Sequence, residues 1–137
     1  MNSTLSASIR KVWSDVHAPK GLPFPVTVQR CLELGVERYH VDYVAKTITA
    51  YVGTAIDVAP VHLEAADASA EWDIAKIKEA LRLVQSGAIS YQEFSRGVID
   101  GGVTNYWAFL KGKRVLYIGK LGDYHVEWFP GAQPKTD

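Results

Sequence analysis

The feature that most constrains this chain is an ordered set of short segments that occurs twice. The repeated segments are 35–39 and 102–106 (GVERY and GVTNY), 51–53 and 117–119 (YVG and YIG), and 62–64 and 125–127 (HLE and HVE). The order is kept, and the spacing shortens only from 67 to 66 and then 63 residues. Such a period is too long for a solenoid repeat, so we interpret the chain as one internally duplicated domain.

The length of 137 residues fits a single domain with a sizeable core, covering 1–137. We expect the two halves at about 4–64 and 71–129. The small, polar stretch 65–70 is the expected connector, and the polar end 130–137 is expected to be a loose tail.

Apolar residues recur at helical spacing in four stretches: Leu5 to Val16, Val28 to Leu32, Ile74 to Val84 and Phe94 to Ile99. Ser90 and Glu93 have the spacing of a capping box before the fourth stretch. Alternating or β-branched stretches predict strands over 36–43, 47–52, 103–110, 113–118 and 124–129, with a short strand near 61–64. Each half therefore reads helix, helix, strand, strand, strand. The predicted fold is α+β, an antiparallel sheet with helices on one face and a pseudo-twofold relation between the halves.

Composition excludes several classes of function. Fifteen basic and fifteen acidic residues leave no net charge, so neither nucleic acid nor an anionic membrane is an expected partner. No stretch approaches the ~20 apolar residues of a membrane span, and the first residues do not resemble a signal peptide. The single cysteine, Cys31, rules out an intrachain disulfide and fits a reducing, cytoplasmic location.

The strand over 103–110 differs most from its counterpart in the first half. Trp107 and Phe109 fall on the face opposite Tyr106, Ala108 and Leu110, so both faces of this strand are apolar. Three covers are open at this point: the chain's own loop over 53–60, a second copy of the protein, or a ligand. We expect Tyr51, Tyr117, Trp128 and Phe129 to line the same surface.

Two sets of polar residues are candidate reactive sites. His62 and Glu64, like His125 and Glu127, lie two apart on a strand and share a face, so the four could ligate a divalent metal if the halves bring them together. A duplicated polar edge strand explains the same residues. His40 lies in a row with Arg38 and Asp42 that could bind an anion or act as an acid–base pair, although a solvated sheet face explains that row as well.

Several of these motifs together resemble the YbcV-like family. The segments that carry the resemblance are 24–26 (FPV), 33–39 (ELGVERY), 101–106 (GGVTNY) and 125–130 (HVEWFP), and it extends over nearly the whole chain. The family consists of small, uncharacterised bacterial proteins, some of them prophage-borne and often labelled "phage envelope protein". The resemblance implies no activity, cofactor or catalytic residue.

The sequence therefore favours a non-enzymatic interaction or small-ligand-binding domain, prophage-associated by resemblance, whose surface includes Trp107, Phe109, Tyr51, Tyr117 and His40. A homodimer is the simplest assembly; an unknown small ligand or protein is the other expected partner. No catalytic residue and no cofactor are assigned. The alternative is a small metal-dependent or acid–base enzyme that uses the duplicated His-x-Glu motifs.

Overall fold

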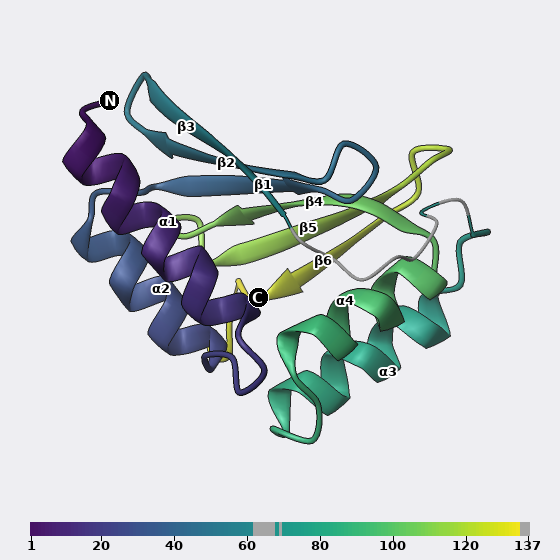
Figure 1. The fold of residues 1–137 in the computed structure, drawn as a ribbon. Coiled ribbons are helices and arrows are strands. Elements are labelled where there is room, and N and C mark those ends of the chain that lie inside the picture. Colours follow the sequence, from purple (N-terminus) through teal and green to yellow (C-terminus); the bar gives the residue numbers. More distant parts are fainter. Residues whose placement is uncertain (62–67, 69, 135–137) are drawn as a thin grey trace.

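A computed structural model describes residues 1–61, 68 and 70–134 of the chain. Within those residues, four helices lie on one side of a six-stranded antiparallel sheet (Figure 1). The helices are α1 (Ser3–His17), α2 (Phe24–Glu33), α3 (Ile74–Gln85) and α4 (Tyr91–Asp100). The strands are β1 (Arg38–Asp42), β2 (Thr47–Val52), β3 (Ala55–Pro60), β4 (Val103–Phe109), β5 (Arg114–Gly119) and β6 (Tyr124–Trp128). The α+β class predicted from the sequence is confirmed.

The strand order is β3-β2-β1-β4-β5-β6, so each half of the chain supplies three adjacent strands. β1 and β4 meet antiparallel at the centre, with Arg38 opposite Phe109 and His40 opposite Trp107. This order places the first strand of each half in the middle of the sheet and the last strand of each half at an edge. Internal duplication is compatible with this order and remains a prediction.

Local signals in the sequence explain where the first helix pair begins and ends. The Asn2 side chain accepts a hydrogen bond from the Leu5 N–H (2.8 Å), which satisfies a free donor at the start of α1. Pro25 stands in the first turn of α2, where a missing N–H costs nothing. Gly35 follows α2 with φ of 84°, a left-handed conformation that glycine adopts without strain.

The second helix pair is equally well signalled and packs closely. The Ser90–Glu93 capping box predicted from the sequence is present at the start of α4. A Cβ atom on Gly97 would lie 2.9 Å from the Cβ atom of Ala80, so α3 and α4 approach each other at a point where only glycine fits. α4 also lies against β4 and α1, and the Gln92 amide donates to the carbonyl oxygen of His17 at the end of α1 (2.7 Å).

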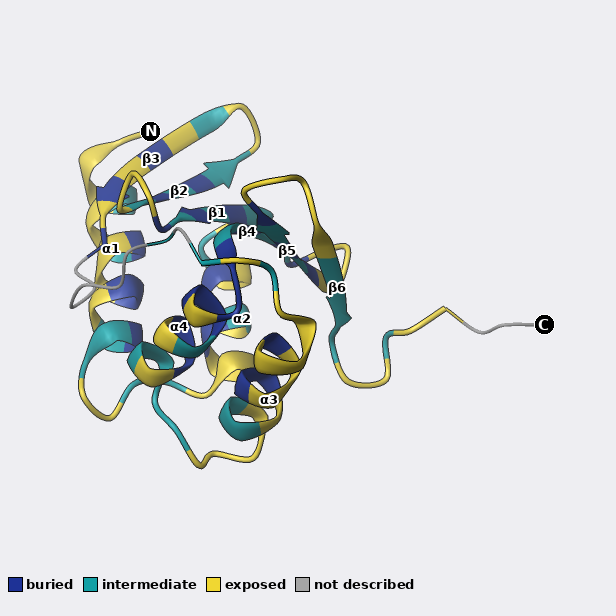
Figure 2. Ribbon diagram, turned by 90° about the vertical axis from the view of Figure 1, so that its right-hand side faces the viewer, coloured by how far each residue is buried: buried dark blue, intermediate teal, exposed yellow. Residues whose placement is uncertain are grey.

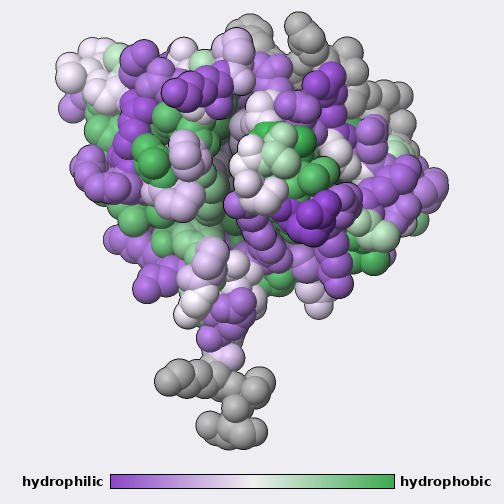
Figure 3. All heavy atoms as spheres, turned by 90° about the horizontal axis from the view of Figure 1, so that it is seen from below, coloured by the Kyte–Doolittle hydropathy of each residue, from purple (hydrophilic) through white to green (hydrophobic). Residues whose placement is uncertain are grey.

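The core lies between the helices and one face of the sheet. Ile9, Val12 and Trp13 of α1 are buried there, as are Ile77 of α3 and Val98 of α4. Figure 2 shows that buried residues gather on the surfaces where helices and sheet face each other, while the outer sides of the helices are exposed. Seen from below, the helical side presents polar residues around scattered apolar ones (Figure 3).

The structure contains one strand that the sequence did not predict, β3 over Ala55–Pro60. The strand predicted near 61–64 falls on residues that, apart from Val61, lie outside the described part of the chain. β3 pairs with β2 in the plane of the sheet, so the segment 53–60 is not the cover that we considered for Trp107 and Phe109. No helix in the described part of the chain is long and apolar enough to cross a membrane.

Candidate functional site

The sheet face turned away from the helices carries no helix or strand of the described residues, and we call it the open face (Figure 1). The strand register places rows of side chains across it. The middle row is Val58, Thr49, His40, Trp107, Leu116 and Val126. The outer rows are Ile56, Tyr51, Arg38, Phe109, Arg114 and Trp128, and Pro60, Thr47, Asp42, Asn105, Ile118 and Tyr124. The open face is therefore broad and mainly apolar.

Trp107 lies at the centre of the open face, in contact with three other rings. Its ring centroid lies 4.5 Å from that of His40, 5.6 Å from Tyr51 and 5.9 Å from Phe109, with the Phe109 ring nearly parallel at 12°. We call Tyr51, His40, Trp107 and Phe109 the aromatic cluster. Such pairs add about 0.5–1.5 kcal/mol each beyond the area they bury, so the rings hold one another in place. These are four of the five ligand or interface residues predicted from the sequence.

The fifth, Tyr117, lies on the other side of the sheet. It is 5% exposed and opposite Tyr106 in the register, so it belongs to the core beneath the helices. Phe129 is also on the helical side, because its ring packs edge-on against Phe24 of α2 at 5.2 Å. The expectation that both line the surface of Trp107 is wrong. Alternation explains the error for Tyr117, since Leu116 and Ile118 of β5 are the residues that share the face of Trp107.

Two arginines lie over rings of the open face. The Arg38 guanidinium carbon is 4.4 Å from the Tyr51 ring centroid, and that of Arg114 is 4.0 Å from the Trp128 ring centroid. Arg38 also donates to the Glu37 carboxylate at 2.9 Å. Cation–π contacts of this kind contribute about 0.5–1 kcal/mol at exposed sites. Arg38 therefore lies between Tyr51 and Phe109 in its row, and Arg114 lies between Phe109 and Trp128.

His40 and Asp42, which share the open face of β1, each make hydrogen bonds that hold the local structure. His40 Nε2 lies 2.9 Å from Asn105 Oδ1, an oxygen that can only accept, so this nitrogen carries the proton. Asp42 Oδ1 accepts from the N–H groups of Val44 and Ala45, both at 2.9 Å, and so closes the turn between β1 and β2. These contacts give His40 and Asp42 a structural role and assign them no acid–base role.

The ends of the open face are its most exposed parts. Ile56 and Val58 on β3 are 52% and 47% exposed, and Tyr124 on β6 is 69% exposed. The residues of the aromatic cluster between them are half-buried by one another. A mainly apolar surface over six strands is unusual for a chain that stays alone in water, because large exposed apolar patches mark interaction sites.

The two His-x-Glu motifs are only partly placed by the structure. His62 and Glu64 lie outside the described residues. His125 and Glu127 are half-buried on the helical side of β6, where His125 Nε2 lies 3.3 Å from Glu127 Oε1. Glu127 Oε2 accepts from the Gln85 amide of α3 at 3.0 Å. The described residues form no cluster of three or more histidine, cysteine or acidic side chains that could hold a metal ion.

A group of tyrosines beneath the sheet was missed by the sequence reasoning. Tyr39, Tyr43 and Tyr106 are buried together, and desolvation by burial raises the pKa of each well above its usual value. The Tyr106 hydroxyl bonds to that of Tyr91, and the Tyr43 hydroxyl donates to Ser95 Oγ at 3.5 Å. The signal available in the sequence was that Tyr39, Val41 and Tyr43 are alternate residues of one strand and therefore share a face. These hydroxyl groups therefore find hydrogen-bond partners within the core.

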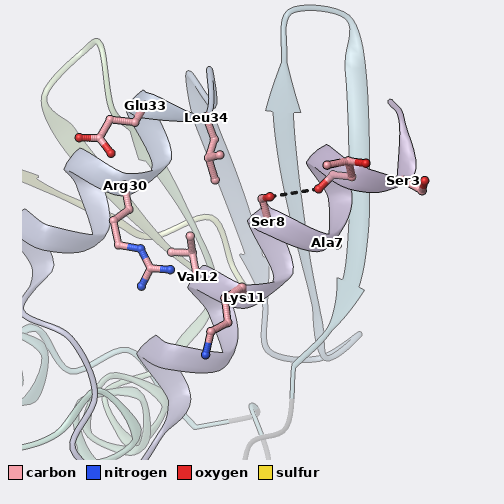
Figure 4. Close-up of a pocket in the computed structure, with 9 residues that line it drawn as sticks. Ser3, Ala7, Ser8, Lys11, Val12, Arg30, Glu33 and Leu34 are labelled. Carbon is pink, nitrogen blue, oxygen red and sulfur yellow. Dashed lines mark hydrogen bonds between the residues drawn. The ribbon is translucent and has the colours of Figure 1, made fainter.

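Two hollows of the described surface lie away from the open face. One, of about 270 Å³, is lined by Glu71, Trp72 and Lys120. The other, of about 680 Å³, is a shallow groove between α1 and α2, lined by Ala7, Val12 and Leu34 together with charged residues (Figure 4). Lys11 and Arg30 at this groove both bond to the Asp15 carboxylate, at 2.9 and 2.7 Å, and thereby lower its pKa. Because these two cations are already paired, the groove has little to offer an anion.

Comparison with known proteins yields a family without an assigned activity. A family model described as "Protein of unknown function (DUF1398)" matches residues 14–125 of the chain. A search of functionally described proteins finds no match. The resemblance seen in the sequence is thereby supported at the level of a small, uncharacterised family. The YbcV-like and phage envelope labels stay predictions.

Proposed function

The chain belongs to the DUF1398 family of proteins of unknown function, and we propose from its geometry that it is a non-enzymatic interaction domain that associates with a second copy of itself through the open face. The observation that carries the proposal is the aromatic cluster centred on Trp107, which occupies the middle of a mainly apolar sheet face that no helix or strand of the described residues covers. Aromatic residues packed at the centre of a surface are the usual anchors of protein interfaces.

The dimensions of the open face suit a protein partner. Six strands about 4.8 Å apart and five to seven residues long give a flat area of roughly 400–500 Å². Projecting side chains enlarge the accessible area toward the ~800 Å² that each partner buries in a standard interface. A small ligand usually occupies a concave pocket, and the hollows described above lie elsewhere. The breadth of this face favours the second copy over a small ligand.

Charge favours one arrangement of the two copies. Arg38 and Arg114 lie in one outer row of the open face, and Asp42 lies in the other. A twofold axis that runs across the strands, between two sheets packed about 10 Å apart, brings each arginine row over the partner's Asp42 row. An axis along the strands would instead face arginine with arginine, which like-charge repulsion disfavours.

The test is the mass in solution by light scattering. We expect the mass of the wild-type protein in solution to exceed that of a 15.1 kDa monomer. The double variant Trp107→Ala/Phe109→Ala should lose the association through the open face, and far-UV circular dichroism should show that it stays folded. The matched control is Val44→Ala/Leu121→Ala, which shortens two highly exposed apolar residues in turns away from the open face and leaves the mass unchanged. A wild-type monomer at high concentration contradicts the proposal.

Two broader parts of the proposal rest on the sequence. A cytoplasmic location is supported by Cys31, which is a free, buried thiol in a chain with no other cysteine. Prophage association is supported by the YbcV-like resemblance alone. It is tested by the genes that neighbour this one: phage structural or lysogeny genes beside it support the association, and unrelated metabolic genes contradict it.

A further inference from the structure

The two edges of the sheet differ in which backbone groups they leave free. At the ends of β6, the Phe129 N–H donates to the Lys113 carbonyl (2.9 Å) and the Gly119 N–H donates to the Asp123 carbonyl (2.8 Å). Because hydrogen-bonded pairs alternate along an antiparallel ladder, the odd-numbered residues of β6 face β5. The backbone groups of Tyr124, Val126 and Trp128 therefore point outward, away from the sheet.

The opposite edge, β3, is protected. Its ladder with β2 includes the bond from the Val61 N–H to the Lys46 carbonyl, so Ile56, Val58 and Pro60 are the residues that face outward. Pro60 has no N–H to offer. The Val58 carbonyl already accepts from the Arg10 guanidinium of α1 at 2.9 Å, and Arg10 is held there by Asp57. These are the devices by which proteins stop a sheet edge from pairing.

β6 has none of these devices among the described residues. Its sequence, Tyr-His-Val-Glu-Trp, contains no proline, lysine or glycine, and no described side chain bonds to the outward backbone groups of Tyr124, Val126 or Trp128. Figure 2 shows that the described part of the C-terminal segment leaves the end of β6 and runs away from the sheet instead of folding back along this edge. An unprotected edge strand is a template for another strand.

We propose that β6 pairs antiparallel with β6 of a second copy, centred on Val126, so that two sheets join edge to edge. Only this register pairs all three outward residues with one another: Val126 faces the partner's Val126, and Tyr124 faces the partner's Trp128. Each of these facing pairs exchanges two hydrogen bonds, which gives about six across the junction. The contact is isologous, as a twofold axis through Val126 requires.

The side chains complement one another in the same register. On the open face, Tyr124 lies beside the partner's Trp128 on both sides of the axis, an aromatic pairing that stabilises antiparallel strands. On the helical face, His125 lies opposite the partner's Glu127, a non-hydrogen-bonded position at which side chains are closest. The doubled His-x-Glu arrangement sought between the halves of one chain thus arises between two chains.

This inference goes beyond the proposed function and does not rest on it. Pairing at β6 extends the sheet in its own plane, whereas the open face binds perpendicular to that plane. The two surfaces can therefore be occupied together, and each can be removed without the other.

Crosslinking tests the register directly. In Val126→Cys, the two cysteines face each other in a hydrogen-bonded pair whose Cα atoms lie about 5.5 Å apart, within the range of a disulfide. We expect mild oxidation to give a covalent dimer on non-reducing gels. The controls are Val58→Cys, the equivalent outward residue of the protected edge, and Tyr124→Cys, whose copies lie about 14 Å apart in this register; neither crosslinks. Native Cys31 is 1% exposed and does not compete.

A proline variant separates this edge from the open face. Val126→Pro removes an N–H that does not bond to β5, so the chain still folds, but it blocks the central pair of the junction. Val58→Pro is the matched control on β3. Light scattering then compares Val126→Pro, Trp107→Ala/Phe109→Ala and the triple variant. A drop in mass with Val126→Pro alone supports edge pairing whatever the face variant does. If Val126→Cys forms no more covalent dimer than Val58→Cys, or forms as much as Tyr124→Cys, edge pairing in this register is refuted.

Discussion

Four tyrosines fill the core side of the sheet and determine how the fold responds to alkaline pH. Tyr39, Tyr43, Tyr106 and Tyr117 are each 5% exposed or less. Desolvation by burial raises the pKa of all four hydroxyls well above the usual value of about 10. Because tyrosinate is charged, the folded protein keeps these protons at a pH where the unfolded chain releases them.

The sign and size of the effect follow from proton linkage. Below about pH 10 both states are protonated and the contribution to stability is complete. Above it these four residues alone let the unfolded chain bind up to four fewer protons, and each missing proton lowers the free energy of unfolding by about 1.4 kcal/mol per pH unit. The four tyrosines together give roughly 5 kcal/mol per pH unit, against a total stability of about 5–15 kcal/mol for a domain. Burial also raises the pKa of Tyr91 and Cys31, which act in the same direction. We expect cooperative unfolding within about one to three pH units above 10.

The assay follows tyrosinate absorbance and far-UV circular dichroism in one alkaline titration, with urea unfolding at several pH values to give the slope. The absorbance of the four buried residues should appear together with the loss of secondary structure. Tyr117→Phe removes one of these protons and should reduce the slope by about 1.4 kcal/mol per pH unit. If all tyrosines ionise while the dichroism stays native, the reasoning from burial is refuted.

Three further changes test other parts of the fold. Gly97→Ala should lower the free energy of unfolding by about 1–3 kcal/mol in urea, because the new methyl group overlaps Ala80 across α3 and α4; a gain of stability, as helix propensity alone predicts, would contradict this close contact. Ser90→Ala should lower the free energy of unfolding by about 1 kcal/mol, because the capping box at the start of α4 is lost. An unchanged midpoint of thermal unfolding would contradict this role of Ser90. Burial raises the pKa of the Cys31 thiol to about 12, so a thiol reagent at about pH 8 should label native protein far more slowly than protein in urea; equal rates would show that Cys31 is accessible.

The helices could be predicted from the sequence because their signals are local. Apolar spacing, the Ser90–Glu93 box and the left-handed glycine Gly35 act within a few residues of one another and need no knowledge of the rest of the fold. The apolar nature of both faces of β4 was also visible in alternation. What alternation does not reveal is which strands become neighbours, so the contacts of Trp107 with His40 and Tyr51 came only from the structure.

β3 was not predicted because its pattern is inverted. Ile56 and Val58 point to the open face and are exposed, whereas Asp57 points to the helical side and is 6% exposed. A charged residue inside and apolar residues outside do not predict a strand in isolation. The inversion is tolerated because the Arg10 guanidinium of α1 contacts the Asp57 carboxylate at 3.2 and 3.3 Å, a partner 47 residues away that no local pattern could identify.

The centre of the open face is where the halves of the chain meet and where they differ most. His40 and Trp107 occupy equivalent positions in the two halves and lie opposite each other, so two identical halves would place a tryptophan opposite a tryptophan. Trp107 instead contacts the ring of His40, and His40 Nε2 is hydrogen-bonded to Asn105. Trp107 is thus held by neighbours of its own chain before any partner arrives, so little side-chain freedom is lost when it becomes buried. Ile56 and Tyr124 are more exposed but lie at the edges. Truncating Trp107 should therefore weaken association through the open face more than truncating either edge residue, although each of those exposes more of its surface in the isolated chain.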